Sequence, residues 1–338
     1  MGLRPALIVP THRADDARSW ALERGLLDTS FHPLSLDGEV AWPLTDAIQC
    51  DIGRIEKMEF QPRMAIDPHT RLQQALPNMK TPRRWEILDD LVLLPQDALL
   101  DGDESTWIAV AQALHCQRVA RQAEIESGPK RRSQVEMLLG NYGWVNHLEN
   151  GVRYLFDVTK VMFSSGNITE RRRMGNTDSA GDIVVDMFAG IGYYSIPLLV
   201  NAGVSYVHAC EMNPDSIEGL TKGLSANKVA ERCRILRGDN QDTAPLLKGV
   251  ADRVLLGLLP SSKEAWPLAV ECLKIEGGVI HVHMNATEES LEDGTFVSTT
   301  VEEFEALGCK VEVLHLEDVK SYSPHIRHVV LDLKVTKL

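Results

Sequence analysis

The sequence predicts an α/β protein, in which a smaller α+β region precedes a mainly parallel sheet with helices on both faces. Two observations predict this architecture. Residues 182–197 read as an apolar strand that ends at Asp186, passes through a glycine turn and continues as a helix. Beyond residue 182, strand-like and helix-like segments alternate, as in a chain of βαβ units. The 338 residues, 44% of them hydrophobic, are enough for two domains.

The elements expected before residue 182 are short. Residues 1–60 mix brief apolar runs with prolines, which favours a small α+β region. A buried strand closed by Pro95 is expected around 85–95, and residues 104–126 predict a helix. Further strands are expected at 135–140, 143–147 and 152–158. The dipeptide Asn150-Gly151 between the last two is typical of a tight hairpin turn.

The elements expected after residue 182 follow the alternating pattern. Strands are predicted at 183–187, 205–210, 233–237, 252–257 and 278–283. Helices are predicted at 193–202, 214–227, 263–274 and 298–307. Two consecutive strands, 310–316 and 327–335, close the chain and suit an antiparallel edge hairpin.

The glycine turn indicates a nucleotide cofactor. It reads Gly190-Ile-Gly192 and lacks the third glycine that brings a helix close to a pyrophosphate. This favours S-adenosylmethionine over NAD. Glu211 ends the second strand, where a carboxylate can bind both ribose hydroxyls, although a surface carboxylate near a helix N-terminus is the alternative. Asp239-Asn240 follows the third strand and can meet the adenine, or can simply begin a turn.

The end of the fourth strand departs from a common pattern. Many amine- and nucleobase-methylating enzymes have Asn or Asp followed by Pro there, but this chain reads Leu256-Gly-Leu-Leu-Pro260. Leu258 stands where the polar residue would be. Either methyl transfer has another geometry, or the chain is not a methyltransferase.

Charge and cysteines exclude several classes of protein. The formal net charge of −13 argues against a protein that coats nucleic acid without specificity. The six cysteines form no Cys-x-x-Cys pair, so we expect free thiols and no metal site. No segment is apolar for long enough to serve as a signal peptide or to cross a bilayer, and we expect a cytoplasmic protein with no membrane partner.

Basic residues cluster at Lys80 with Arg83-Arg84, at Lys130-Arg131-Arg132 and at Arg171-Arg172-Arg173.

Six segments together resemble one family. They are Phe163-Ser-Ser-Gly-Asn-Ile-Thr-Glu-Arg, Asp186-x-Phe-Ala-Gly-Ile-Gly-Tyr, His208-Ala-Cys-Glu-x-Asn-Pro, Gly238-Asp-Asn, Gly257-Leu-Leu-Pro-Ser-Ser and Val319-Lys-Ser-Tyr-x-Pro. The chain is similar, over roughly residues 85–338, to the tRNA wybutosine-synthesising protein 2 family. The resemblance implies a class I S-adenosylmethionine-dependent, Rossmann-like transferase domain. It also implies an enzyme that transfers the aminocarboxypropyl group to 4-demethylwyosine in phenylalanine tRNA.

Two departures separate the chain from the related tRNA guanine-N1 methyltransferases. Those relatives have Ser-Pro-Arg where this chain has Ser164-Ser165-Gly166, and Asn-Leu-Pro where it has Leu258-Leu259-Pro260. Both departures favour aminocarboxypropyl transfer. A guanine methyltransferase is the alternative, a cofactor-binding module that only docks tRNA is a third interpretation, and a dehydrogenase is the most distant.

The resemblance also implies site residues. Ser164 and Arg171 would contact the methionine end of the cofactor, Glu211 the ribose, and Asp239 with Asn240 the adenine. The rest of the expected cofactor site comprises Phe188, Gly190, Gly192, Met212, Asn213 and Pro260. Asp157 and Lys160 either shape the same wall or form a salt bridge with each other. No catalytic base is assigned, since an electron-rich ring carbon can attack without one.

The resemblance further implies a division of labour along the chain. Residues 1–150 are expected to form the α+β domain that docks tRNA, with Lys80, Arg83, Arg84, Lys130, Arg131 and Arg132 on the RNA backbone. Residues 151–181 would connect the domains and contribute to the cofactor pocket, and residues 182–338 would form the transferase domain. We expect a monomer.

Overall fold

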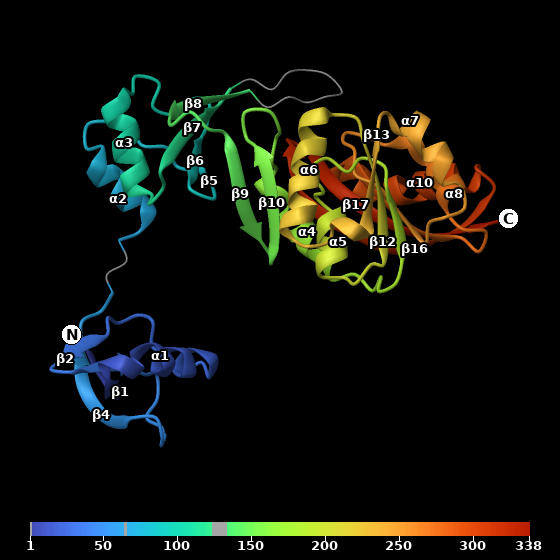
Figure 1. Cartoon of the computed structure of the whole chain (residues 1–338). Coiled ribbons are helices and arrows are strands. Elements are labelled where there is room, and N and C mark those ends of the chain that lie inside the picture. The colour runs from blue at the N-terminus through green and yellow to red at the C-terminus, as the bar shows by residue number, and fades with distance from the viewer. Residues whose placement is uncertain (1, 64–65, 124–133) are drawn as a thin grey trace. The chain divides into compact units, whose positions relative to one another are not determined.

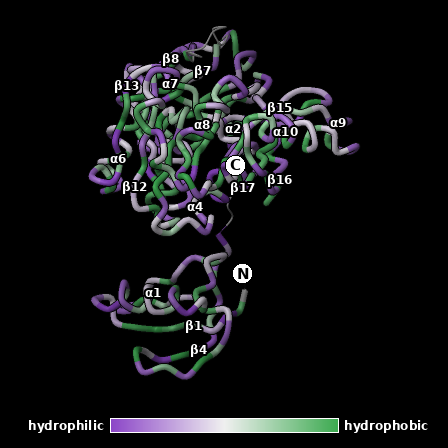
Figure 2. Tube along the Cα trace, turned by 90° about the vertical axis from the view of Figure 1, so that its right-hand side faces the viewer, coloured by the Kyte–Doolittle hydropathy of each residue, from purple (hydrophilic) through white to green (hydrophobic). Residues whose placement is uncertain are grey.

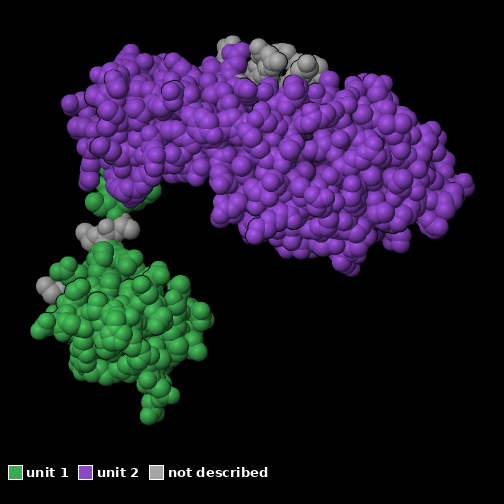
Figure 3. All heavy atoms as spheres, in the orientation of Figure 1, with its two compact units in different colours: residues 1–70 green, residues 71–338 purple. Residues whose placement is uncertain are grey.

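The computed structural model describes residues 2–63, 66–123 and 134–338. The chain divides into two compact units, residues 1–70 and 71–338, which Figure 3 shows in two colours. The expected domain range 1–150 therefore spans the first unit and part of the second. The basic cluster Lys130-Arg131-Arg132 lies outside the described residues.

The first unit is a small α+β structure, as the sequence predicts. Four strands form an antiparallel sheet in the order β2 (Leu34–Leu36), β3 (Glu39–Pro43), β1 (Gly2–Pro10) and β4 (Arg54–Phe60). The central strand β1 is mostly hydrophobic along its length (Figure 2). Helix α1 (Ala14–Glu23) buries Ala17 and Ala21 against Leu7 and Val9 of β1. Alternation of side chains across β1 thus gives the sheet an apolar face for the helix.

The second unit begins within a helix that starts at Pro68, and its first part is a four-stranded sheet with two helices. Helices α2 (Pro68–Ala75) and α3 (Glu104–Ala113) pack on strands ordered β5 (Glu86–Leu88), β6 (Leu91–Leu94), β7 (Arg118–Gln122) and β8 (Val135–Leu139). The predicted helix 104–126 is wrong from Leu114 to Ala123, and residues 124–126 lie outside the described residues. His115 has φ +57°, which ends the helix, and Val119 instead pairs with Val92 in a parallel ladder. The expected strand around 85–95 is two strands, because Asp89 turns the chain with φ +60°.

A two-stranded hairpin connects this sheet to the large one. Strands β9 (Trp144–Glu149) and β10 (Val152–Asp157) pair antiparallel. Asn150 and Gly151 have φ +50° and +78°, so both occupy the left-handed region that a type I′ turn requires. The hairpin predicted from Asn150-Gly151 is confirmed.

The large sheet has seven strands. It belongs to the C-terminal part of the chain, which Figure 1 colours from yellow-green to red. Its order is β13 (Cys233–Arg237), β12 (Tyr206–Glu211), β11 (Ile183–Asp186), β14 (Arg253–Leu256), β15 (Gly278–Thr287), β17 (Ile326–Lys337) and β16 (Cys309–Ser323). The first five run parallel, and β17 pairs antiparallel with both β15 and β16. The predicted α/β class and the closing antiparallel strands are confirmed, although these two strands are longer than expected.

Helices cover both faces of this sheet. They are α4 (Ile168–Gly175), α5 (Ser195–Val200), α6 (Pro214–Ala226), α7 (Asn240–Thr243), α8 (Trp266–Cys272), α9 (Glu288–Glu292) and α10 (Thr295–Glu305). One apolar core contains β10, α5 and α6, and a second contains α8 and α10. The sequence does not predict helix α4, because three consecutive arginines give it little apolar periodicity. None of the helices in the described ranges is long and apolar enough to span a membrane.

Candidate cofactor site

The glycine turn lies between β11 and α5, at the carboxyl edge of the parallel strands. Gly190 and Gly192 have φ +56° and +89°. A Cβ on Gly190 would lie 2.6 Å from the Tyr193 ring, and a Cβ on Gly192 would lie 2.6 Å from Ile196 Cγ1. A side chain is therefore excluded at both positions. The positive φ is unfavourable for other residues, and neighbouring atoms already occupy the space where a Cβ would lie. The turn presents bare backbone, as a closely approaching ligand requires.

Glu211 is fixed beside this turn. Strands β11 and β12 are parallel neighbours, so their ends meet at one edge of the sheet. One carboxylate oxygen of Glu211 accepts a hydrogen bond from Gly190 N at 2.7 Å, and the other accepts from Asn213 N at 2.6 Å. The side chain is half-buried. Each oxygen keeps a further lone pair, so this carboxylate can still accept hydrogen bonds from a diol.

The expected adenine residues join the same edge. Asn240 donates from Nδ2 to the carbonyl oxygen of Met187 in the glycine turn, at 3.3 Å. Asp239 caps α7 by accepting from Gln241 N at 2.9 Å, and Asn213 caps α6 by accepting from Asp215 N at 3.0 Å. The ends of three neighbouring strands thus bring the glycine turn, Glu211 and Asn240 together.

The end of β14 forms the next part of this rim. Gly257 packs close to the turn, since a Cβ there would lie 3.4 Å from the Tyr194 ring and 3.9 Å from the Phe188 carbonyl oxygen. Leu258 follows with 37% of its surface exposed. The carbonyl oxygen of Pro260 accepts from Asn285 N of β15 at 2.9 Å. Met212 lies on the opposite part of the edge, after β12, and is 41% exposed.

Arg171 is tied to the protein rather than free in the site. It is 2% exposed, and two of its nitrogens donate to the Glu149 carboxylate at 2.6 Å each. Its third nitrogen group donates to the carbonyl oxygen of Ser164 at 2.9 Å, and the guanidinium lies 4.4 Å from the centre of the Phe163 ring. Burial raises the pKa of Glu149, but the hydrogen bonds and charges of Arg171 and His147 together outweigh burial and lower this pKa. The observed contacts of Arg171 position Ser164.

Tyrosines connect Ser164 to the glycine turn. Tyr193 donates its hydroxyl to the carbonyl oxygen of Met162, and its ring lies 6.0 Å from that of Phe163. Tyr154 donates to the Tyr193 carbonyl oxygen at 3.2 Å. The segment from Met162 to Ser164 is therefore held against the turn. Sequence reasoning missed the two tyrosines, since aromatic residues in an apolar strand and turn give no separate signal.

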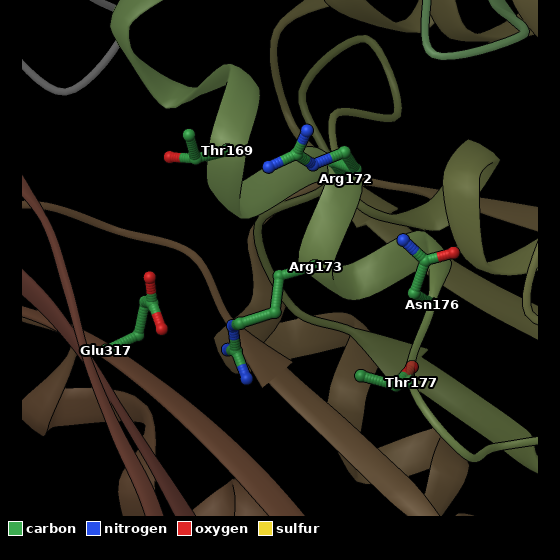
Figure 4. A pocket seen from close by; sticks show the side chains of 6 residues that line it. All are labelled: Thr169, Arg172, Arg173, Asn176, Thr177 and Glu317. Carbon is green, nitrogen blue, oxygen red and sulfur yellow. The ribbon is translucent and has the colours of Figure 1, made fainter.

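The arginine triplet is mostly internal, contrary to its interpretation as one basic cluster. Besides Arg171, Arg173 is engaged: it donates to Glu170 at 2.7 Å and to Asp332 of β17 at 2.6 Å. Only Arg172 of the three is exposed. It lines a hollow of about 470 Å³ with Thr169, Arg173, Asn176, Thr177 and Glu317, between α4 and β16 (Figure 4). This hollow is lined by none of the residues of the glycine turn.

Lys160 and the basic residues Lys80, Arg83 and Arg84 differ in their contacts. Lys160 pairs with Asp215 at 3.3 Å, whereas Asp157 accepts from Thr159, so the suggested Asp157–Lys160 salt bridge is wrong. In the turn after β10, the Asp157 carboxylate also accepts from the backbone N–H of Thr159. Lys160 instead pairs with a residue of α6. Lys80, Arg83 and Arg84 are exposed and form no ion pair within the described part of the chain.

Breaking the Glu149–Arg171 pair should destabilise the fold. Glu149→Ala leaves a buried guanidinium without its counter-ion, and we expect a loss of about 3–5 kcal/mol in the free energy of unfolding. Urea denaturation measures it. The double variant Glu149→Leu with Arg171→Met removes both charges and should recover most of the loss. Equal destabilisation by the single and double variants would contradict this assignment.

Asp186 should make stability fall with rising pH. It is fully buried, and burial raises its pKa to about 6, although Ser195 Oγ donates to it at 2.6 Å. The folded state therefore retains this proton above the unfolded pKa, and the associated stability is lost as pH rises from about 4 to 6. Relative to Asp186→Asn, the free energy of unfolding of the wild type should fall by on the order of 3 kcal/mol over this pH interval. Denaturation of both proteins at pH 4 to 7 tests this, and a difference independent of pH would refute it.

Family models and relatives agree with this architecture. Residues 145–314 match the TRM5/TYW2 methyltransferase domain, and residues 70–143 match the TYW2 N-terminal domain. The chain is 46% identical over 262 residues to tRNA wybutosine-synthesizing protein 2/3/4 of Arabidopsis thaliana, covering 75% of this chain and 26% of that protein. It is 33% identical to the tRNA wybutosine-synthesizing protein 2 homolog of Danio rerio, across the whole of both chains. The chain thus spans about a quarter of the plant relative.

Solved structures show the same fold. Pyrococcus horikoshii TYW2 in complex with MeSAdo is 32% identical, covers 79% of this chain and 99% of its own, and has a TM-score of 0.69. The Methanocaldococcus jannaschii tRNA m1G37 methyltransferase is 25% identical and covers 99% of this chain and 100% of its own, with a TM-score of 0.62. With its glycine turn and strand-end carboxylate on this scaffold, the chain belongs to the TYW2 family, a relative of the Trm5 enzymes.

Proposed function

We propose that this protein transfers the 3-amino-3-carboxypropyl group of S-adenosylmethionine to 4-demethylwyosine next to the anticodon of phenylalanine tRNA. The observation that carries the proposal is the end of β14. There, Gly257-Leu258-Leu259-Pro260 places an exposed leucine beside the glycine turn, where related methyltransferases have a polar residue. The relative from Pyrococcus horikoshii was solved with MeSAdo, the nucleoside that remains when this group leaves S-adenosylmethionine.

In this proposal, each part of the cofactor contacts its own part of the site. The bare backbone at Gly190 and Gly192 admits the amino acid end, and Glu211 accepts from the ribose hydroxyls. Asp239 and Asn240 meet the adenine. Phe188, Met212, Asn213 and Pro260 complete the proposed site. These groups fit S-adenosylmethionine, because they offer one carboxylate to the ribose diol and no cluster of cations to a pyrophosphate.

The protein selects the product by orientation. When bound, S-adenosylmethionine supplies a sulfonium whose three attached carbons are all open to displacement by a nucleophile in line with the sulfur. Leu258 offers no acceptor to hold a guanine nitrogen against the methyl group, and Gly166 offers no side chain. Ser164, whose carbonyl oxygen accepts from Arg171, contacts the amino acid chain in this proposal. We assign no general base.

One observation favours a second function. The Methanocaldococcus jannaschii methyltransferase covers 99% of this chain and Pyrococcus horikoshii TYW2 covers 79%, although the Danio rerio TYW2 homolog also covers the whole chain. A tRNA guanine-N1 methyltransferase is therefore the alternative. Leu258 and Gly166 weigh against it.

The released nucleoside distinguishes the two reactions. The protein is incubated with S-adenosylmethionine and phenylalanine tRNA carrying 4-demethylwyosine, and small molecules are identified by mass spectrometry. We expect methylthioadenosine and a tRNA heavier by one aminocarboxypropyl group. S-adenosylhomocysteine would establish methyl transfer instead. The same tRNA with unmodified guanine at that position is the matched substrate control.

The exposed basic residues before β5 should contribute to RNA affinity. Arg83 and Arg84 are exposed, and we propose that they and Lys80 bind phosphates together with Lys130, Arg131 and Arg132. Arg83→Gln with Arg84→Gln should weaken tRNA binding and reduce the slope of log affinity against log salt by about 1 for each phosphate that is no longer neutralised. Filter binding at several salt concentrations measures this. Arg234→Gln, an exposed arginine on β13, should change neither quantity, and an unchanged slope in the double variant would remove these residues from the interface.

A further inference from the structure

Lys320 lies at the edge of the proposed site although it is remote in sequence. Strand β16 brings its Nζ to 2.6 Å from Ser164 Oγ, to which it donates a hydrogen bond. The same side chain lies over Gly166: a Cβ on that glycine would be 3.0 Å from Lys320 Cδ and 3.2 Å from Nζ. The missing side chain of Gly166 therefore makes room for a cation supplied from β16.

The ammonium of Lys320 lacks a counter-ion in the described part of the chain. It is half-buried, and no carboxylate there lies within 4 Å of it. The negative charge of Glu86 acts to raise the pKa of Lys320, but the Glu86 carboxylate accepts a hydrogen bond from Ser165 Oγ at 2.6 Å. The nearby Arg171 is already paired with Glu149. Burial, and then the charge of Arg171, lower the pKa of Lys320, as expected for a cation that needs a partner.

The surroundings of Lys320 contain unpaired polar atoms. His328 of β17 is its cross-strand partner, so the two side chains share one face of the sheet. His328 is 1% exposed and its Nδ1 has no hydrogen-bond partner among the described residues, while its Nε2 is 3.2 Å from His283 Nδ1. Within the same ranges, Asn167 Oδ1 is likewise buried without a partner. Buried polar atoms of this kind normally find a partner in protein, water or ligand.

A short path connects Lys320 to the glycine turn. Ser164 follows Phe163, which packs against Tyr193 of the turn, and Tyr193 donates to the Met162 carbonyl oxygen. Of the parts of S-adenosylmethionine, only the amino acid end carries a carboxylate. An ammonium beside Ser164 is therefore placed at the end of the cofactor that it can neutralise.

We propose that Lys320 binds the carboxylate of the amino acid end of S-adenosylmethionine and so holds the aminocarboxypropyl chain toward the acceptor base. This assignment rests on the proposed function for the direction of the chain. Its role is positioning, since the reaction forms a bond from the acceptor carbon to Cγ and breaks the Cγ–sulfur bond, with the electron pair leaving on sulfur. The carboxylate keeps its charge throughout.

Removing the carboxylate from the ligand tests the contact. Binding of S-adenosylmethionine, decarboxylated S-adenosylmethionine and methylthioadenosine is measured by calorimetry for the full chain and for Lys320→Met. The wild type should bind the carboxylated ligand roughly tenfold to a hundredfold more tightly than the decarboxylated one. Lys320→Met should bring these two affinities to within about threefold of each other and leave methylthioadenosine affinity unchanged. Lys320→Arg should restore part of the preference.

Controls separate this contact from folding and from RNA binding. Lys310→Met removes an exposed lysine of the same strand and should leave all three affinities unchanged. Glu211→Gln should weaken all three ligands alike. If Lys320→Met keeps the wild-type preference, the proposal is overturned, and a loss of tRNA affinity in that variant would assign Lys320 to a phosphate. A wild type that binds none of the ligands would refute the proposed function itself, whereas binding with an unchanged preference refutes only the role of Lys320.

Discussion

The buried ion pair between Glu149 and Arg171 is the interaction on which the arrangement of the site depends. Glu149 ends β9 of the hairpin, and Arg171 belongs to α4. Two hydrogen bonds of 2.6 Å fix the helix to the hairpin, and the remaining donors of Arg171 fix the Ser164 carbonyl. Neither charge could be buried alone, because desolvating an unpaired ion costs several kcal/mol. The pair therefore couples the position of Ser164 to the correct folding of two separate elements.

A second set of charges holds the other side of α4. Arg173 bridges Glu170 and Asp332, and Asp332 also accepts from His281 Nδ1 at 2.5 Å. Arg253 donates to the other ring nitrogen of His281 at 2.6 Å, which is consistent with a neutral imidazole. Burial lowers the pKa of His281, and the hydrogen bond that His281 donates to Asp332 only partly opposes this shift. Helix α4 has little apolar surface of its own, so buried polar contacts anchor it to the sheet.

These constraints explain how one scaffold can support different transfer reactions. The glycine turn, Glu211 and Asn240 use backbone and strand ends, which are common to the fold. In the proposed site, the groups around the amino acid end come instead from the segment that leads into α4, the end of β14 and the tip of the β16–β17 hairpin. Leu258, Gly166 and Lys320 can change there without disturbing the adenosine wall. Selection among the three carbons of a sulfonium then depends on few side chains.

The sequence by itself determined the parallel sheet, its closing antiparallel strands, the hairpin at Asn150-Gly151 and the strand-end position of Glu211. Each of these depends on local periodicity, on turn chemistry or on the rule that parallel strand ends meet at one edge. Only the tertiary structure decided that the helix expected through residue 126 ends at Ala113 and that two arginines of the triplet at 171–173 are internal. It also brought Lys320 to Ser164, 156 positions away in the chain. The reason is physical: these outcomes depend on parallel pairing across a sheet and on pairing of buried charges, and neither leaves a local pattern in the sequence.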